Sequence, residues 1–361
     1  MNLETFINTP GLIFDVRSPG EFFQGRIPTA LNLPLFSDNE RSQIGTLYKQ
    51  VSRQSAIEKG LEIVVPKVSE LIDFVVSAVP KGSVKIHCWR GGMRSASVAL
   101  MLNSVGLTTC TLQGGYKSFR KWALKTLTTP YQLHILGGMT GSGKTAILQE
   151  LKNLGEQVLD LESLAGHRGS TFGNLGLSLQ PTNEQFENEI AMQWHSFDPS
   201  KPVWIEDESR TIGSCKIPDN IFNAMKNSPF FLIERPLDER LEQIKNDYWQ
   251  HSLQDLISCA QRLSKKLGGL RTKELITYIE QSAFKEATVL LLEYYDTTYN
   301  HEMKRREPAI NRLTGEKLSN YAWAKKLIYS KELNRRNFGC AESLGDKLIK
   351  CPVLYTTGPF N

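Results

Sequence analysis

The sequence predicts an α/β protein with two parallel-sheet domains followed by a mostly helical C-terminal region. Two observations lead to this prediction: short apolar strands alternate with helical segments, and two of the strands run directly into glycine-rich loops at residues 88–95 and 138–145. Strands that alternate with helices favour a parallel sheet, because each crossover connection needs room for a helix. A chain of 361 residues, 40% of them hydrophobic, is long enough for each domain to bury its own core.

The first domain is expected over residues 1–128. Its segment 11–17 is an apolar strand that enters a turn, and Ser18-Pro19-Gly20-Glu21 has the chemistry of a turn and a helix start. Further elements alternate along the chain, with expected helices at 66–79, 93–104 and 116–127 and strands at 84–87 and 109–112. The polar stretch 38–60 interrupts this alternation, and we interpret it as an insertion.

A second α/β domain is expected over residues 129–250, after a linker at 128–130. Strands are expected at 133–136, 157–161, 203–205 and 230–233, with helical segments between them. From residue 238 onward the pattern is mostly helical, and we expect residues 251–361 to pack on the second domain.

Composition excludes several classes of protein. The first residues lack the basic start and apolar stretch of a secretory signal, and no apolar run approaches membrane-spanning length. We therefore expect a cytoplasmic protein with no membrane partner. The six cysteines are scattered, without the short spacings of a zinc site or a disulfide framework. A net charge of +5 does not itself establish a nucleic-acid partner, but basic residues cluster late in the chain, at 265–266, 304–306, 325–326 and 335–336.

The loop after the strand at 84–87 offers a nucleophile. A cysteine between a buried strand and a helix N-terminus lies among backbone N–H groups, and these favour the thiolate form of Cys88. Arg90 and Arg94 would add positive charge and bind an anionic donor, and Gly91 and Gly92 would let the backbone approach it. A buried structural cysteine is the alternative, but the flanking glycines and arginines argue against it.

The second glycine-rich loop fits the pattern of a phosphate-binding P-loop, with a strand before it and a helix after it. Its glycines let N–H groups approach phosphate, its lysine bridges phosphate oxygens, and Thr145 is placed to bind Mg²⁺. The expected phosphate-binding residues are Gly138, Gly141, Ser142, Gly143, Lys144 and Thr145. No metal site is certain from the sequence, and Mg²⁺ is the candidate.

Other residues are weaker candidates. The strand at 203–205 runs into three acids, of which Asp207 or Glu208 would hold a metal or polarise a water, unless the acids form a solvated turn. His167 and Arg168 lie in a glycine-rich segment that would act as a mobile substrate loop or as a plain surface loop. Arg210 is a further candidate substrate contact.

The first 125 residues resemble the rhodanese family. The resemblance lies in the Cys88 loop and in Asp15-Val16-Arg17, Glu21-Phe22, Gly25-Arg26-Ile27-Pro28-Thr29-Ala30 and Asn32-Leu33-Pro34. Rhodaneses carry sulfur, or occasionally selenium, as a persulfide or perselenide on the loop cysteine, so the resemblance implies that role for Cys88. Asp15 is expected to be structural.

The combination of motifs resembles bacterial tRNA 2-selenouridine synthases over at least residues 1–250. The resemblance rests on the two loops together with residues 112–120, 167–170 and 206–210, and is weaker beyond, where only 267–269 contributes. It implies action on wobble 2-thiouridine in the tRNA anticodon loop. The sulfur would be geranylated from geranyl diphosphate, and selenium from selenophosphate would displace the geranylthio group. These are co-substrates, so no tightly bound cofactor is expected.

Given this resemblance, we infer that the P-loop holds a diphosphate instead of hydrolysing ATP. A wobble base already lies in a single-stranded loop, so Trp89 is a candidate stacking platform, with core packing as its alternative. The late basic clusters would bind tRNA phosphates. Two other functions remain open: a sulfurtransferase fused to an ATP-dependent kinase-like domain, and a nucleotide-regulated adapter. The sequence also leaves open which tRNAs are used, and whether the tRNA moves between the two loops or the domains close around it.

Overall fold

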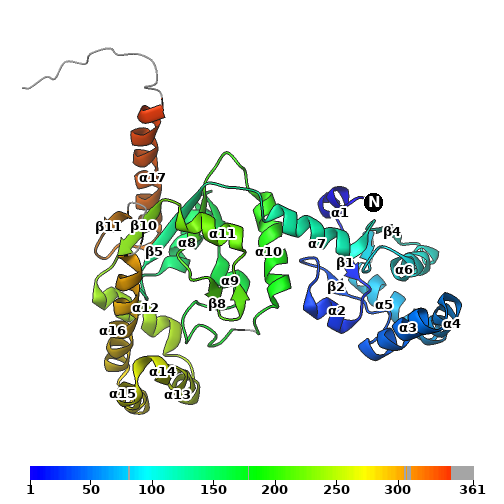
Figure 1. Ribbon diagram of the computed structural model, residues 1–361, viewed down its shortest axis with the longest axis horizontal. Coiled ribbons are helices and arrows are strands. Elements are labelled where there is room, and N and C mark those ends of the chain that lie inside the picture. The colour runs from blue at the N-terminus through cyan, green and yellow to red at the C-terminus, as the bar shows by residue number, and fades with distance from the viewer. Residues whose placement is uncertain (80–81, 178, 305, 307–309, 343–361) are drawn as a thin grey trace, which may run out of the picture.

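The chain forms two lobes in the computed structural model, and helices α7 and α10 lie side by side between them (Figure 1). The structure describes residues 1–361 except 80–81, 178, 305, 307–309 and 343–361, and it describes only the backbone of residues 333–342. The basic pair at 335–336 therefore has no described side chains, Arg305 lies outside the described residues, and so does Cys351.

The N-terminal lobe is built on a parallel sheet, as the sequence predicts, and the strand order is β2-β1-β3-β4. Its strands are β1 (Leu12–Asp15), β2 (Leu31–Asn32), β3 (Ser83–His87) and β4 (Thr108–Thr111). The central pair places Asp15 opposite His87, so the residues that follow β1 and β3 meet at one edge of the sheet. Cys88 lies at this edge.

Helices cover the sheet of the N-terminal lobe. They are α1 (Leu3–Asn8), α2 (Pro19–Gln24), α3 (Asp38–Gln50), α4 (Arg53–Val64), α5 (Val68–Ala78), α6 (Met93–Ser104) and α7 (Gly115–Thr126), with a short 3-10 turn, η1 (Val65–Lys67), between α4 and α5. The stretch interpreted as an insertion is ordered: α3 and α4 pack against each other as a helical hairpin, each capped at its start by a serine side chain.

The second lobe contains a five-stranded parallel sheet in the order β11-β10-β5-β7-β6. Its strands are β5 (Leu133–Gly138), β6 (Gln157–Leu159), β7 (Val203–Glu206), β10 (Phe230–Glu234) and β11 (Ile310–Thr314), and a small hairpin joins β8 (Thr211–Ile212) to β9 (Cys215–Lys216). The helices along this part of the chain are α8 (Lys144–Asn153), α9 (Leu161–Ala165), α10 (Asn183–Ser196) and α11 (Asp219–Lys226).

The C-terminal region is mostly helical, as predicted. It comprises α12 (Leu237–Tyr248), α13 (Leu253–Arg262), α14 (Ser264–Leu267), α15 (Gly269–Glu280), α16 (Phe284–Met303) and α17 (Asn320–Glu342). One element differs: β11 extends the sheet by pairing with β10, and α17 packs on α8. The division that the sequence suggested at residue 250 therefore cuts through one sheet. Along the described residues, no helix is both long and apolar enough to cross a membrane.

One hydrophobic cluster crosses between the lobes. Phe119 and Ala123 of α7 are fully buried in the same cluster as Phe186, Ile190 and Trp194 of α10. Buried apolar area of this kind is the main favourable term in folding. The two lobes therefore share a core and are held in a fixed relation.

Candidate active sites at the Cys88 loop and the phosphate loop

Cys88 follows β3 directly, and the loop after it leads to the start of α6 at Met93. Gly91 has a φ of 67°, and a Cβ atom on it would lie 2.4 Å from the carbonyl oxygen of Leu112. Only glycine tolerates both the backbone conformation and the close approach. The N–H of Tyr116 donates to the carbonyl oxygen of Cys88 at 2.8 Å, so the first turn of α7 holds the loop in place.

The thiol of Cys88 is buried, with only 3% of the residue exposed, and it accepts a hydrogen bond from the N–H of Gly92 at 3.3 Å. The hydroxyl of Ser95 lies 3.3 Å from Sγ. Burial alone raises the pKa of the thiol, but the hydrogen bonds from Ser95, Arg90 and Gly92 outweigh burial and hold the pKa of Cys88 below its ordinary value. The loop therefore favours a thiolate, the nucleophilic form.

The two arginines of this loop have different surroundings. Arg94 donates to Glu21 at 2.8 Å, and both side chains are partly buried, so its charge is already matched. Arg90 is exposed, and its guanidinium makes no hydrogen bond or ion pair with any residue that the structure describes. The sequence proposed both as anion contacts, and Arg90 is the one whose charge is available.

A buried arginine, Arg17, packs beneath the aromatic side chains that support the Cys88 loop. The sequence did not indicate it as a site residue. Arg17 is 1% exposed, donates to Asp15 at 2.5 Å, and lies 3.9 Å from the centre of the Tyr116 ring. Trp89 packs on the same ring, with centroids 5.7 Å apart, yet 38% of Trp89 remains exposed. Asp15 is thus structural, and Trp89 has one packed side and one accessible side.

The phosphate loop joins β5 to α8, which begins at Lys144. Gly141 and Gly143 both adopt left-handed backbone angles, with φ of 81° and 74°. A Cβ atom on Gly138 would lie 2.4 Å from Oγ of Ser142, which is buried and has no hydrogen-bond partner among the described residues. Lys144 donates from Nζ to the carbonyl oxygen of Gly138 at 3.1 Å, so the lysine folds back over its own loop.

Thr145, at the start of α8, faces a cluster of acids of which Glu206 is buried and the others are partly buried. Its hydroxyl donates to Glu162 at 3.2 Å, and the N–H of Glu162 donates to Glu206 at 2.8 Å. Burial, and then repulsion from Glu162, raises the pKa of Glu208 to about 8. Burial and the neighbouring carboxylates also raise the pKa of Glu206 well above its ordinary value. This acidic cluster consists of Asp160, Glu162, Glu206 and Glu208.

Sequence reasoning missed half of this cluster. Asp160 and Glu162 follow β6, while Glu206 and Glu208 end and follow β7, and these strands are neighbours in the sheet. The carboxyl ends of adjacent parallel strands meet at one edge, which was the available signal. Within the described ranges, no three His, Cys, Asp or Glu side chains are arranged to hold a metal ion by themselves.

Asp207 and Arg210 are each engaged in an ion pair. Asp207 accepts hydrogen bonds from Arg306 at 2.7 Å and from the hydroxyl of Tyr299 at 3.4 Å, so its charge is matched. The hydroxyl of Tyr299 also accepts from the N–H of Gly138 at 2.9 Å. Arg210 forms an exposed ion pair with Asp219 at 2.5 Å. Of the candidates that follow β7, Glu208 lies near Lys144, and Asp207 reaches the phosphate loop through Tyr299. Arg210 makes no hydrogen bond or ion pair with the described residues of that loop.

The glycine-rich segment after α9 packs against the helical region. His167 is buried, and burial, followed by the charge of Arg262, lowers its pKa. Arg168 donates to the carbonyl oxygen of Leu175 at 3.1 Å and lies 5.7 Å from the centre of the Tyr248 ring. A Cβ atom on Gly169 would lie 2.7 Å from Glu162, so the segment closes over the acidic cluster. Its charged side chains make structural contacts.

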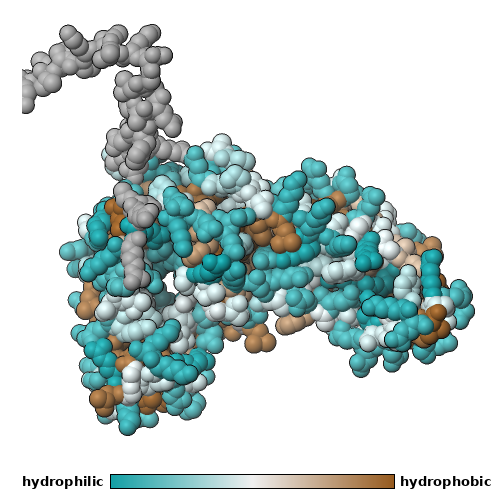
Figure 2. All heavy atoms as spheres, in the orientation of Figure 1, coloured by the Kyte–Doolittle hydropathy of each residue, from teal (hydrophilic) through white to brown (hydrophobic). Residues whose placement is uncertain are grey.

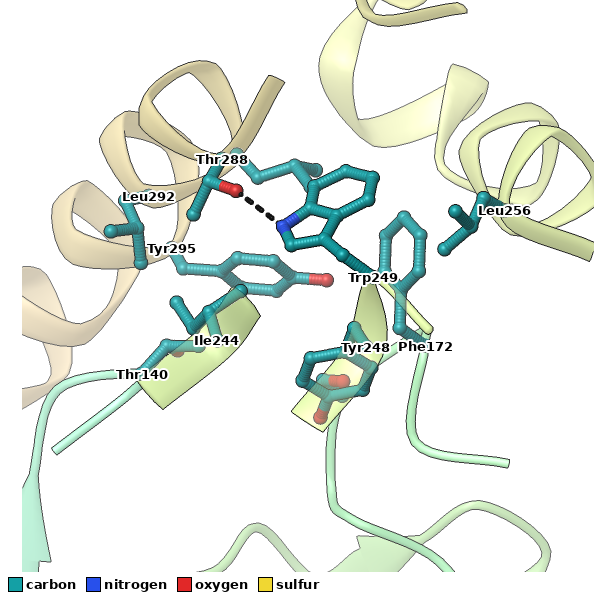
Figure 3. Close-up of a pocket in the computed structure, with 11 residues that line it drawn as sticks. Thr140, Phe172, Ile244, Tyr248, Trp249, Leu256, Thr288, Leu292 and Tyr295 are labelled. Atoms are coloured by element: carbon teal, nitrogen blue, oxygen red, sulfur yellow. Dashed lines mark hydrogen bonds between the residues drawn. The ribbon is translucent and has the colours of Figure 1, made fainter. Parts of the chain in front are cut away.

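An aromatic pocket lies beside the phosphate loop (Figure 3). Thr140 of the loop lies at its edge, and the nitrogen of Trp249 donates to the hydroxyl of Thr288 at 2.9 Å. Arg240 of α12 donates to the carbonyl oxygen of Thr140 at 2.8 Å and thereby holds the loop against this wall. The pocket is lined by apolar and aromatic side chains, among them Phe172, Ile244, Tyr248, Trp249, Leu292 and Tyr295.

Comparisons with known proteins agree with this architecture. A family model for the tRNA 2-selenouridine synthase AAA domain matches residues 131–328, and a rhodanese-like domain model matches residues 2–121. A tRNA 2-selenouridine synthase from Aeromonas salmonicida is 34% identical over 342 residues, which are 84% of this chain and 90% of that protein.

Two further relatives carry the same name. The one from Marinobacter nauticus is 32% identical over 346 residues, covering 85% of this chain and 92% of that protein. The one from Pseudomonas syringae pv. tomato is 34% identical over 338 residues, covering 82% of this chain and 90% of that protein. The rhodanese-like and P-loop domains expected from the sequence are confirmed, and the chain belongs to the tRNA 2-selenouridine synthase family.

Proposed function

We propose that this chain converts wobble 2-thiouridine of tRNA to 2-selenouridine in two steps. Geranyl transfer from geranyl diphosphate makes S-geranyl-2-thiouridine, and selenium from selenophosphate then replaces the geranylthio group. The observation that carries the proposal is that one chain pairs Cys88, whose thiol accepts a hydrogen bond from the N–H of Gly92, with a glycine-rich phosphate loop that ends at Lys144, the first residue of α8. Neither domain alone indicates this substrate, because both folds serve many functions.

The phosphate loop would carry the first step. Its N–H groups and Lys144 would bind the diphosphate. The aromatic side chains beside Thr140 would contact the apolar chain, and the pocket between them, at about 30 Å³, would have to widen to admit it. As the tRNA sulfur bonds to the first carbon of the geranyl group, the carbon–oxygen bond breaks and diphosphate leaves. Donors that meet the developing negative charge stabilise this transition state.

Mg²⁺ would fit this step as a partner of the diphosphate. Mg²⁺ is commonly bound through one or two carboxylates together with substrate phosphates and water. The hydroxyl of Thr145 and the carboxylates of Glu162 and Glu208 would be the ligands that the protein provides. A bound cation would also relieve the repulsion between these carboxylates.

The Cys88 loop would carry the second step. Alkylation turns a poor leaving group into a good one, so the selenium of selenophosphate bound at the Cys88 loop can form the carbon–selenium bond as geranylthiol leaves. Water then cleaves the phosphorus–selenium bond and releases phosphate. The N–H groups around Sγ and the available charge of Arg90 would bind the anionic selenium donor. Trp89 would stack on the flipped-out base with its accessible side.

An ATP-dependent activity is the second candidate, and the P-loop itself favours it. A purine ring and a geranyl chain both fit an aromatic wall, so nucleotide must be tested directly. An adapter function is disfavoured, because the surroundings of Cys88 lower its pKa and an adapter has no use for a thiolate.

The test is geranyl transfer to tRNA that carries 2-thiouridine, without nucleotide, followed by mass analysis of the nucleosides. Lys144→Ala should lower the rate by roughly 100-fold or more, a loss typical of a charge-stabilising donor. Lys245→Ala, an exposed lysine on α12, is the matched control and should retain the wild-type rate. An unchanged rate for Lys144→Ala, or a strict requirement for ATP, would contradict the assignment of this loop to the alkyl diphosphate.

A further inference from the structure

A large groove opens beside Cys88, far along the chain from the phosphate loop. It has a volume of about 590 Å³ and runs between the α3–α4 hairpin and α6. Its walls are mostly apolar and include Ile44, Tyr48, Ile57, Leu61, Met93 and Met101, and Cys88 and Trp89 also line it. This volume falls within the range of about 300–1,000 Å³ that is usual for small-molecule sites.

The apolar walls of this groove are open to solvent. Tyr48 is 61% exposed, Leu61 56% and Met93 50%. Each lies on a helix, α3, α4 and α6 in turn, and on the side of it that is not packed against the core. Figure 2 shows apolar atoms on the face of the hairpin that is turned to the viewer. Contiguous exposed apolar surface in a concave site indicates a ligand, because it carries a cost in water until it is covered.

Positive charge lines the rim of the groove. Arg41, Lys49, Arg53 and Arg90 border it, and the last three form no ion pair with any described residue. An apolar floor with a basic rim is complementary to one kind of molecule: an apolar chain attached to an anion. A prenylated nucleotide within an RNA strand has both parts.

Building on the two-step reaction proposed above, we propose that the groove between the α3–α4 hairpin and α6 binds the geranyl chain of the alkylated tRNA during the selenium step. The chain is attached through sulfur to the carbon that selenium attacks. Because Cys88 lines the same groove, a chain lying there would keep that carbon near Cys88, and the basic side chains that border the groove would meet the neighbouring phosphates. The groove would thus select geranylated thiouridine over thiouridine, and the stretch that interrupts the first domain would have this role.

The occupant is a prenyl chain and not the nucleobase alone. A base needs hydrogen-bond partners for its edges, whereas the middle of the groove between Ile57, Leu61 and Met101 offers apolar side chains. An apolar segment of a protein would be the other kind of occupant, and it would bind without regard to the modification of the RNA.

Binding of anticodon stem-loop RNA to the full chain tests the proposal. Three synthetic RNAs carry S-methyl-, S-prenyl- and S-geranyl-2-thiouridine, and a fourth carries 2-thiouridine. Wild-type affinity should rise with chain length, because each buried methylene adds to binding. Leu61→Asn should weaken binding of the geranylated RNA about tenfold and flatten the series, while binding of the 2-thiouridine RNA should stay the same.

Leu100→Asn is the matched control, because Leu100 is 72% exposed on α6 and does not line the groove. Both leucines are exposed, so thermal unfolding should be close to wild type for both variants. A wild-type preference for the geranylated RNA that persists in Leu61→Asn would overturn the groove assignment and leave the two-step reaction standing. A protein that binds all four RNAs equally overturns the groove assignment too. Failure of wild-type protein to convert the geranylated RNA with selenophosphate would instead contradict the proposed function.

Discussion

The hydroxyl of Tyr116 donates a hydrogen bond to Oε1 of Glu184 at 2.5 Å. This contact links α7, whose first residues hydrogen-bond to the Cys88 loop, to the P-loop domain. Tyr116 lies in α7, and Glu184 lies in the first turn of α10. Asn188 donates to the same hydroxyl at 2.8 Å, and Arg120 donates to Asn188 at 2.9 Å. With the shared core, this network opposes closure of one lobe onto the other. The anticodon loop, and not the protein, is therefore expected to move between the two sites.

Tyr116→Phe should lower the free energy of unfolding by about 1–3 kcal/mol, because Glu184 and Asn188 each lose a partner in a largely buried position. Urea unfolding measures the change. Tyr48→Phe, on an exposed tyrosine, should have no comparable effect. Equal stability of Tyr116→Phe and wild type would show that the network does not hold the lobes together.

The lowered pKa of Cys88 depends on the hydroxyl that lies next to it. Ser95→Ala removes one hydrogen bond to Sγ, so the thiolate should form at a higher pH than in the wild type. The pH dependence of Cys88 alkylation, followed by mass spectrometry, reports this midpoint. Cys215 and Cys259, whose pKa values burial raises, serve as internal references and should not shift. An unmoved midpoint for Cys88 would assign the shift to the backbone N–H groups alone.

The raised pKa of Glu208 makes stability depend on pH. Below its ordinary pKa of 4.5 the folded and unfolded chains both hold the proton, and between 4.5 and about 8 only the folded chain keeps it. The stabilising contribution is therefore complete below pH 4.5 and is lost as the pH rises to about 8. Glu208→Gln stays neutral at every pH. The difference between its melting temperature and that of the wild type should therefore increase as the pH rises from 4.5 to about 8.

Each kcal/mol corresponds to roughly 2–4 °C for a domain of 150–250 residues, so differential scanning fluorimetry resolves the trend. Glu242→Gln, on an exposed glutamate, is the control. Parallel melting profiles for Glu208→Gln and wild type would contradict the assignment of the raised pKa to this residue.

Trp89 should contribute to RNA binding by stacking. Trp89→Ala should weaken binding of an anticodon stem-loop by about 1–3 kcal/mol, the usual contribution of one stacked base, while Trp89→Phe should retain most of the affinity. Fluorescence anisotropy measures both. If Trp89→Ala instead lowers stability and leaves affinity unchanged, the indole is a packing residue of the Tyr116 ring.

The sequence predicted what local patterns encode. An apolar strand followed by glycines and a helix predicted the position of both loops, and α6 has the bounds 93–104 that were expected. Contacts between distant segments leave no such pattern. The pairing of Arg94 with Glu21, that of Asp207 with Arg306, and the addition of β11 to the sheet each depend on tertiary packing.

The groove had a partial signal in the sequence. The polar composition of residues 38–60 predicted an interruption of the first domain. It gave no indication that Tyr48 and Ile57 would line a groove together with Cys88. Glu162 was missed because its distance along the chain from Glu206 hides the adjacency of β6 and β7. Topology, which sets the strand order, was needed to bring these carboxylates together.

The central claim is that the Cys88 loop delivers selenium to a base that has already been geranylated. The most direct measurement is mass analysis of wobble nucleosides from cells that carry wild-type protein, Cys88→Ala or, as the control for a cysteine outside the site, Cys110→Ala. Cys88→Ala should lose 2-selenouridine and accumulate S-geranyl-2-thiouridine, while Cys110→Ala should match wild type. Unchanged 2-selenouridine in Cys88→Ala would contradict the account.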